Sequence, residues 1–190
     1  MSEPSAASPD FSTTLRPALA KLAADPDAIT SRKLWKALTV PERQQALMAT
    51  LAADDQGWVK ARVQGALVKA KRYRPQTVAA MNAMKLAGEL APAPVDDAGL
   101  IDAALVDLHF GQRRAMMGAF LDALGVPHEE GRLPEDTSSL GITPEKLHAA
   151  ADRVAGAQPP DELYVYFLTL VLQDRATWGG LGDWMKSRAK

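Results

Sequence analysis

The chain has 190 residues, of which 47% are hydrophobic, 24% are charged and 6% are aromatic, and its formal net charge is −1. These values are ordinary for a soluble globular protein with a core of its own. Cysteine is absent, which excludes disulfides, thiolate metal sites and cysteine nucleophiles and fits a reducing cytosol. Alanine is abundant, and small helix-favouring residues indicate closely packed helices rather than strands.

The chain opens with MSEPSAASPDFSTT, in which no basic region precedes an apolar core. We therefore expect no secretory signal and a disordered tail over residues 1–12. Helix-start signals then recur: Thr39 and Glu42 have the spacing of a capping box, and Thr143 stands before a proline and a glutamate. With the helical spacing of apolar residues, these signals predict helices over 13–24, 27–38, 41–53, 57–72, 76–90, 98–109, 111–124, 144–155, 161–174 and 180–187.

The fold class that follows is all-α. We expect a compact bundle of eight to ten short helices, an arrangement that allows two closely packed lobes. The segment LAPAPVDDAG, residues 90–99, reads as a stiff extended connector between those lobes. Residues 1–91 carry 13 Lys and Arg against 8 Asp and Glu, and residues 92–190 carry 9 against 15. We therefore expect a basic helical lobe over 13–91 and an acidic one over 92–190, facing each other or facing different partners.

The segment KARVQGALVKAKRYRP, residues 60–75, carries six basic side chains, and no Asp or Glu occurs from residue 56 to 88. Such a segment suits an acidic protein surface, the acidic second half of this chain, nucleic-acid phosphates or plain solvent. One nearby aromatic, Tyr73, is too few for a base-stacking platform. We prefer a protein partner, contacted through Lys60, Arg62, Lys69, Lys71, Arg72 and Arg74.

Two arginines begin the predicted helix 111–124, whose apolar residues cover more than one stripe and so predict burial on several sides. Adjacent helix positions point about 100° apart, so one of Arg113 and Arg114 is expected to face inward and to pair with an acid, for which Asp107, Asp122 and Glu162 are the candidates. The alternative is an anion pocket lined by both arginines and His109. Gly125 stands where a left-handed C-cap would end this helix.

The loop VPHEEGRLPEDTSSLGI, residues 126–142, is longer than most connections, which is typical of functional or mobile loops. In it, His128, Glu129 and Glu130 have the chemistry of a divalent-metal site or a general acid–base pair, with Asp122 as a further ligand. Consecutive residues rarely aim three side chains at one point, so we prefer a solvated turn. We expect no metal and no cofactor.

A second acid–histidine pair, Glu145 and His148, has the Glu-x-x-His spacing that di-iron bundles use. Those bundles need the motif twice, and a second copy is absent from this sequence. Glu145 is equally explained as a first-turn acid that complements the helix dipole.

The run LYVYFLTLVL, residues 163–172, has about half the length that a membrane-spanning helix needs, so we expect a buried core helix and no membrane contact. Further along, Trp178 and Trp184 are separated by a segment with three glycines, and glycine at that density breaks a helix. These tryptophans either dock onto the core or contact a partner.

The sequence has no Gly-rich phosphate loop, nucleophile elbow, His-Glu-x-x-His motif or dinucleotide fingerprint. We therefore favour a non-catalytic, cytoplasmic interaction module of bacterial type, an adaptor or regulatory subunit that contacts another protein through the basic residues of 60–74 and through Trp178 and Trp184. One alternative is a nucleic-acid-binding protein that uses residues 60–74. The other is a metal-dependent or acid–base enzyme around His128, Glu129 and Glu130.

Overall fold

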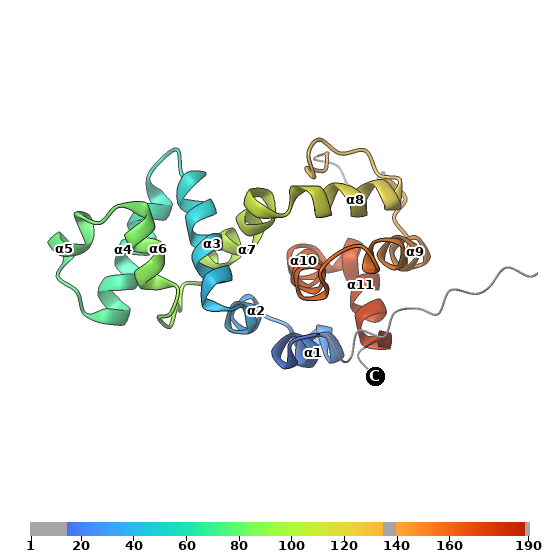
Figure 1. Ribbon diagram of the computed structural model, residues 1–190, viewed down its shortest axis with the longest axis horizontal. Coiled ribbons are helices and arrows are strands. Elements are labelled where there is room, and N and C mark those ends of the chain that lie inside the picture. The colour runs from blue at the N-terminus through green and yellow to red at the C-terminus, as the bar shows by residue number, and fades with distance from the viewer. Residues whose placement is uncertain (1–14, 135–139, 189–190) are drawn as a thin grey trace, which may run out of the picture. The chain divides into compact units, whose positions relative to one another are not determined.

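The computed structural model describes residues 15–134 and 140–188 (Figure 1). Within these ranges the regular elements are helices, accompanied by one isolated β-bridge, so the predicted all-α class is confirmed. The chain forms two compact units. We call residues 30–114 the central unit, and residues 1–29 with 115–190 the terminal unit. The predicted tail, residues 1–12, lies outside the described residues.

The central unit consists of α2 (Ser31–Ala37), α3 (Val40–Ala52), α4 (Trp58–Lys71), α5 (Pro75–Ala79), α6 (Ala83–Leu90) and α7 (Ala98–Gln112). Helix α3 packs along α7, and α4 packs against α6. The predicted capping box starts α3: the Glu42 N–H donates to the Thr39 hydroxyl at 3.3 Å, and the Thr39 N–H donates to the Glu42 carboxylate at 2.7 Å. A local signal in the sequence therefore fixes the start of the helix on which the core of this unit is built.

Small residues set the spacing between α3 and α7. A Cβ atom added at Gly111 would lie 3.0 Å from the Cβ of Ala49, closer than ordinary van der Waals contact. Ala46 and Ala104 are fully buried in the same unit. The alanine-rich composition thus does what the sequence indicated, which is to let helices approach closely around a few large aliphatic side chains.

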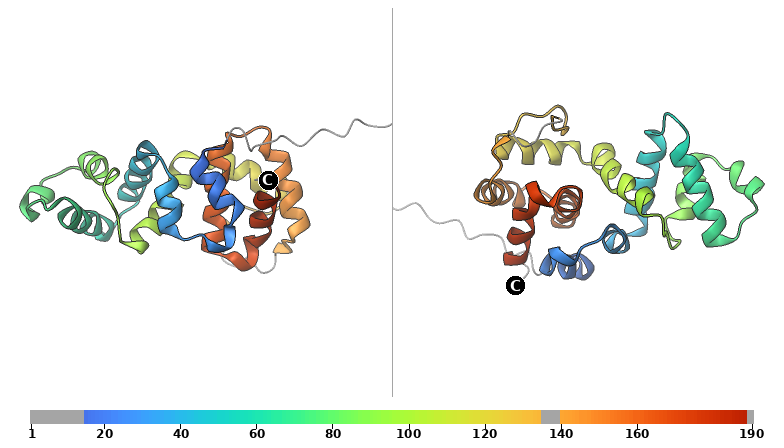
Figure 2. Two further views of the ribbon diagram at one scale, coloured as in Figure 1. Left: turned by 90° about the horizontal axis from the view of Figure 1, so that it is seen from below. Right: turned by 180° about the vertical axis from the view of Figure 1, so that it is seen from behind.

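The terminal unit consists of α1 (Pro17–Ala24), the 3₁₀-helix η1 (Pro26–Ala28), α8 (Arg114–Leu124), α9 (Pro144–Ala155), α10 (Pro160–Gln173) and α11 (Arg175–Arg188). Figure 2 shows from two further sides that α11 lies against both α9 and α10. As predicted, α10 is a core helix, and every residue from 163 to 169 is buried. The Phe120 ring of α8 packs against the rings of Phe167, Tyr166 and Trp178, with centroids 4.9, 5.9 and 6.4 Å away.

The part of the chain that the structure describes contains no helix long and apolar enough to cross a membrane. The longest apolar stretch, in α10, is buried among aromatic side chains of its own unit instead.

Two predicted helices are each interrupted once. The predicted helix 27–38 begins as η1 and restarts at α2, because the Thr30 hydroxyl accepts from the Lys33 N–H and caps a new helix. The predicted helix 76–90 divides into α5 and α6, because the Asn82 side chain accepts from the Lys85 N–H at 2.9 Å. In both cases an N-cap side chain inside the expected segment satisfies a backbone donor and starts a second helix.

The expectation that glycines interrupt the helix after Trp178 is wrong, since α11 runs continuously from residue 175 to 188. A Cβ at Gly180 would lie 3.0 Å from the Cα of Pro144, and one at Gly182 would lie 3.2 Å from Pro26. These glycines let α11 approach α9 and η1 closely. Tertiary packing therefore outweighs the low helix propensity of glycine.

The units divide the chain at residues 29/30 and 114/115, whereas the sequence suggested a boundary between 91 and 92. The connector 91–97 and α7 belong with α2–α6, because α7 packs on α3. The charge asymmetry persists under the observed division. The central unit carries 13 Lys and Arg against 8 Asp and Glu, a net of +5, and the terminal unit carries 9 against 15, a net of −6.

Candidate functional site

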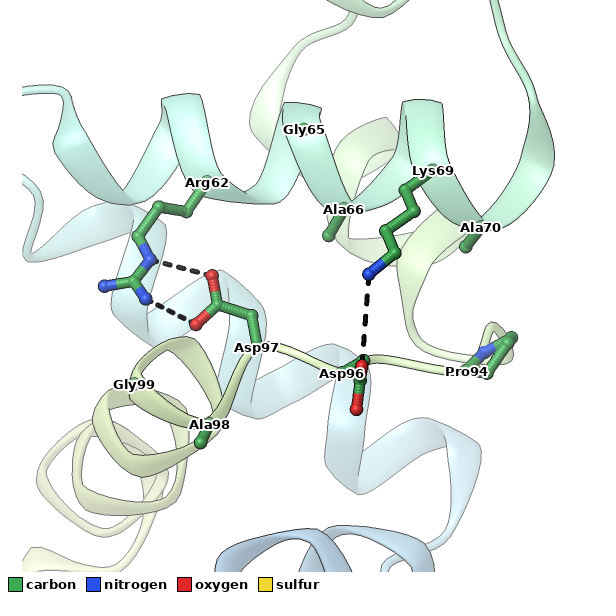
Figure 3. Close-up of a pocket in the computed structure, with 10 residues that line it drawn as sticks. All are labelled: Arg62, Gly65, Ala66, Lys69, Ala70, Pro94, Asp96, Asp97, Ala98 and Gly99. Carbon is green, nitrogen blue, oxygen red and sulfur yellow. Dashed lines mark hydrogen bonds and ion pairs between the residues drawn. The ribbon is translucent and has the colours of Figure 1, made fainter.

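A groove of about 880 Å³ opens in the central unit between α4 and the segment that leads into α7 (Figure 3). One wall is the exposed face of α4, where small side chains alternate with long cations at helical spacing. The other wall is the connector and the first turn of α7. The lining residues are Arg62, Gly65, Ala66, Lys69, Ala70, Pro94, Asp96, Asp97, Ala98 and Gly99.

Ion pairs tie the two walls together. The Arg62 guanidinium donates to both carboxylate oxygens of Asp97, with its Nε 2.8 Å from Oδ2. The Nζ of Lys69 lies 3.9 Å from a carboxylate oxygen of Asp96, and Figure 3 shows both contacts crossing from α4 to the connector. From α2, the Arg32 guanidinium reaches Asp96 as well, 2.8 Å from the carboxylate and 2.9 Å from the backbone carbonyl. Two adjacent carboxylates thus join α2 and α4 to the start of α7.

Asp97 makes two contacts that fix the wall of the groove. Besides pairing with Arg62, its carboxylate accepts from the Leu100 N–H at 3.0 Å and so caps α7. The hydrogen bonds from the Arg62 side chain, helped by this backbone donor, lower the pKa of the Asp97 carboxyl below its usual value. Asp97 is therefore an ionised structural group at neutral pH rather than a proton donor.

Two neighbours of Arg62 fix the position of its guanidinium. A Cβ at Gly99 would lie 3.0 Å from a terminal nitrogen of Arg62, so the glycine leaves room for the side chain over the first turn of α7. On its other side, the guanidinium lies 5.5 Å from the ring centroid of Trp58, a cation–π distance. Trp58 is 47% exposed, so a large aromatic surface stands in solvent next to the groove.

The six basic residues predicted as partner-binding have different surroundings. Arg62 and Lys69 line the groove, whereas Lys71 turns to α6, where its Nζ and the Tyr73 hydroxyl both bond to Glu89, at 2.7 and 2.9 Å. The hydrogen bonds from Lys71 and Tyr73 lower the pKa of Glu89. The other three, Lys60, Arg72 and Arg74, are exposed. Arg62 and Lys69 thus pair with acids of residues 92–190, one of the alternatives that the sequence left open, whereas Lys71 pairs with Glu89, which lies outside that range.

The predicted anion pocket at the end of α7 is not assembled as a shared pocket. Arg113 is buried, with its guanidinium 3.3 Å from the Glu42 carboxylate of α3, while Arg114 is exposed and donates to the Phe110 carbonyl. His109 is 2% exposed, and burial, reinforced by the Arg113 charge, lowers its pKa well below the usual value. One arginine faces inward and contacts an acid, as the helix geometry predicted, but this acid is Glu42 of α3 and not Asp107, Asp122 or Glu162.

His128, Glu129 and Glu130 form a tight turn that packs on α8. Glu129 and Arg132 pair as a β-bridge, and the two residues between them have positive φ values, 50° at Glu130 and 87° at Gly131. The Gly131 N–H donates to Nδ1 of His128 at 3.2 Å, and Nε2 of the same ring lies 3.2 Å from the Asp122 carboxylate. Both ring nitrogens of His128 therefore have a partner within the terminal unit.

Elsewhere in the terminal unit, Glu145 and His148 act separately. Hydrogen bonding from Thr143 lowers the pKa of Glu145, and the Nε2–H of His148 donates to the Gly180 carbonyl at 2.9 Å. Over residues 15–134 and 140–188, no group of three or more His, Asp or Glu side chains is arranged to hold a metal ion.

Trp178 and Trp184 are core residues, 3% and 2% exposed, and not an open surface. The Trp184 indole N–H donates to Asp152 of α9 at 2.7 Å, and its ring packs on Phe167. Of the two interpretations of the sequence, docking onto the core is the one observed. Among residues 15–134 and 140–188, the exposed aromatic is Trp58, which no pattern in the sequence singled out.

The sequence analysis also missed Asp96, Asp97, Arg32 and Gly99 as parts of one site. A signal existed for Asp97, which stands three residues before Leu100 at the start of a predicted helix and so has N-cap spacing. Nothing local indicated that this cap would meet Arg62, 35 residues away.

Comparison of the chain with protein-family models, curated proteins and solved structures finds no match.

Proposed function

We propose that the protein is a non-catalytic interaction module and that a segment of another protein docks in the groove of the central unit. The observation that carries this proposal is the form of the groove, in which a floor of glycine and alanine is bordered by charged side chains. Small floor residues let a partner backbone approach closely, and charged borders fix its register. Trp58, an exposed aromatic beside the groove, is a residue type enriched at protein interfaces.

The composition of the groove supports binding over acid–base chemistry. Its titratable side chains, Arg62, Lys69, Asp96 and Asp97, are engaged with one another. A general base needs a pKa near the working pH, whereas that of Asp97 is lowered from an already acidic value. An adaptor or regulatory subunit in a reducing, cytoplasmic setting is the class of protein that these features support.

The groove favours a protein partner over a nucleic acid. Its floor of glycine and alanine leaves room for a peptide backbone, and none of its lining residues is an aromatic on which a base could stack. The exposed cations Lys60, Arg72 and Arg74 do not line the groove, so phosphate binding through them would be independent of it.

A groove-filling substitution tests this proposal. Ala66→Trp places an indole on the groove floor, and Ala61→Trp places the same group at an exposed position of α4 outside the groove. Proteins captured from a cell extract by the wild type and by each variant are compared by quantitative mass spectrometry, after circular dichroism shows that both variants are folded. We expect a partner that is retained by Ala61→Trp and weakened about tenfold or more by Ala66→Trp, about 1.4 kcal/mol.

Capture that is indifferent to Ala66→Trp would contradict the proposal. A mobility-shift titration with DNA and RNA at low salt tests the alternative. Binding that falls steeply with salt, and that is lost on Arg72→Ala with Arg74→Ala but not on Ala66→Trp, would show a nucleic-acid-binding protein instead.

A further inference from the structure

We propose that the groove accepts an acidic segment of its partner and that Asp96 is a built-in competitor for the same cations. This inference rests on the proposed docking function and names the chemistry of the segment that docks. It is argued from the carboxylates that the site already holds.

The groove binds carboxylates within its own chain. Arg62 from α4 takes Asp97, while Arg32 from α2 and Lys69 from α4 converge on Asp96. Three cations from two helices are therefore directed at two neighbouring acidic side chains. A cationic site of this kind selects a negatively charged ligand, because like charges placed against it are repelled.

The two carboxylates are not held equally. Asp97 is a bidentate partner of Arg62, caps α7, and keeps only 28% of its side chain exposed. Asp96 is 66% exposed, and both of its cations are exposed as well: Arg32, 52% exposed, lies 2.8 Å away, and Lys69, 79% exposed, lies 3.9 Å away. Exposed ion pairs contribute little to stability and exchange readily with solvent. Asp96 is thus the carboxylate that an acidic ligand can replace, while Asp97 keeps the wall of the groove in place.

The surroundings of Lys69 extend the positive region along α4. No Asp or Glu occurs from residue 56 to 88, and Arg72, three residues beyond Lys69, is exposed. An acidic segment lying along this face would meet Asp96 and Asp97 as the only acids among the groove-lining residues. The floor at Gly65, Ala66 and Ala70 leaves room for its backbone.

The test uses a synthetic amphipathic peptide of about four helical turns with glutamates along one face. The same peptide with lysines in place of glutamates and a single-stranded oligonucleotide of equal length serve as comparisons. Binding is measured by calorimetry and by the change in intrinsic tryptophan fluorescence, to which the exposed Trp58 beside Arg62 contributes. We expect the acidic peptide to bind the full-length wild-type chain and to lose binding on Ala66→Trp.

The distinguishing variant is Asp96→Asn, which removes the competing charge. We expect it to tighten binding of the acidic peptide about threefold to fivefold, the effect of a single exposed ion pair, and Lys69→Ala to weaken it by a similar factor. Asp55→Asn and Lys36→Ala change the net charge of the same unit equally at exposed positions that do not line the groove. We expect these controls to change affinity far less.

The other outcomes separate this inference from the proposed function. If the lysine peptide bound more tightly than the acidic one, and Ala66→Trp abolished that binding, the ligand would not be acidic. The proposal that a partner docks in the groove would still stand. Equal effects of Asp96→Asn and Asp55→Asn would overturn the role of Asp96 as competitor. Peptide binding unaffected by Ala66→Trp would contradict both proposals, and tighter binding of the oligonucleotide than of either peptide would favour a nucleic-acid ligand. Failure of the acidic peptide to bind at low salt would also overturn the inference.

Discussion

The two units of this protein bury different kinds of side chain. The terminal unit has an aromatic core in which Phe120, Phe167 and Trp184 pack ring against ring. In the central unit, all of which the structure describes, Trp35 is the one buried Phe, Tyr or Trp residue, and the core is otherwise aliphatic, with buried Thr50, His109 and Arg113 as its polar members. Large rings bury more apolar area per residue than aliphatic side chains do. The core of the terminal unit therefore buries more apolar area per side chain, and the proposed docking groove lies in the unit with the aliphatic core.

The largest expected effect is on the aromatic core. Phe120→Ala removes a fully buried ring that contacts three others, and it should lower the free energy of unfolding by about 4 kcal/mol. Urea denaturation measures this loss, and amide hydrogen exchange followed by mass spectrometry locates it. Protection should fall first in α8, α10 and α11. An equal loss in α3 and α7 would show that the two cores are not energetically distinct.

The corresponding test of the central unit concerns its buried ion pair. Glu42→Ala removes both the carboxylate that the Arg113 guanidinium contacts and one half of the capping box of α3. Because a buried cation is left without that counter-charge, we expect a loss of about 3 kcal/mol, detected as reduced exchange protection of α3 and α7. Glu42→Gln keeps an acceptor at this position and should lose less. Equal losses in the two variants would argue against an electrostatic cause.

Mild acid should destabilise the central unit through His109. Burial and the Arg113 charge lower its pKa in the folded state, so the unfolded chain binds more protons below about pH 6.5 and stability falls as the pH falls. Between pH 7 and 5.5 we expect a loss of about 1 kcal/mol, measured by urea denaturation across that range. Asp107 acts in the opposite sense at lower pH, because burial raises its pKa and the folded state retains the proton. His109→Leu should remove the effect, and an unchanged pH dependence in this variant would assign it to other groups.

The sequence predicted most of the fold because helix signals are local. The capping box at Thr39 and the proline after Thr143 specify their helix starts from residues within one turn. The apolar run at 163–172 likewise indicated a buried helix by its length and composition, and α10 is one. Two failures were also local, because Thr30 and Asn82 cap new helices inside predicted ones. At Gly180 a distant contact was responsible, since the continuous α11 uses this glycine to approach Pro144.

The candidate site was only half visible in the sequence. The run of cations along α4 could be read directly, because spacing within one helix determines which side chains share a face. Which acids these cations would meet depends on where the connector passes, and the contact between Arg62 and Asp97 joins residues 35 positions apart.

By itself, then, the sequence determined the helices, their caps, the apolar run of α10 and the separation of positive from negative charge. Only the tertiary structure decided which residues form each unit and whether Trp178 and Trp184 are buried. It also decided that Asp96 and Asp97 form ion pairs with α4 and so line a groove. The physical reason for this division is the distance along the chain over which each interaction acts. Backbone hydrogen bonds and helical periodicity act over a few residues, whereas burial and ion pairing depend on elements that the folded chain brings together.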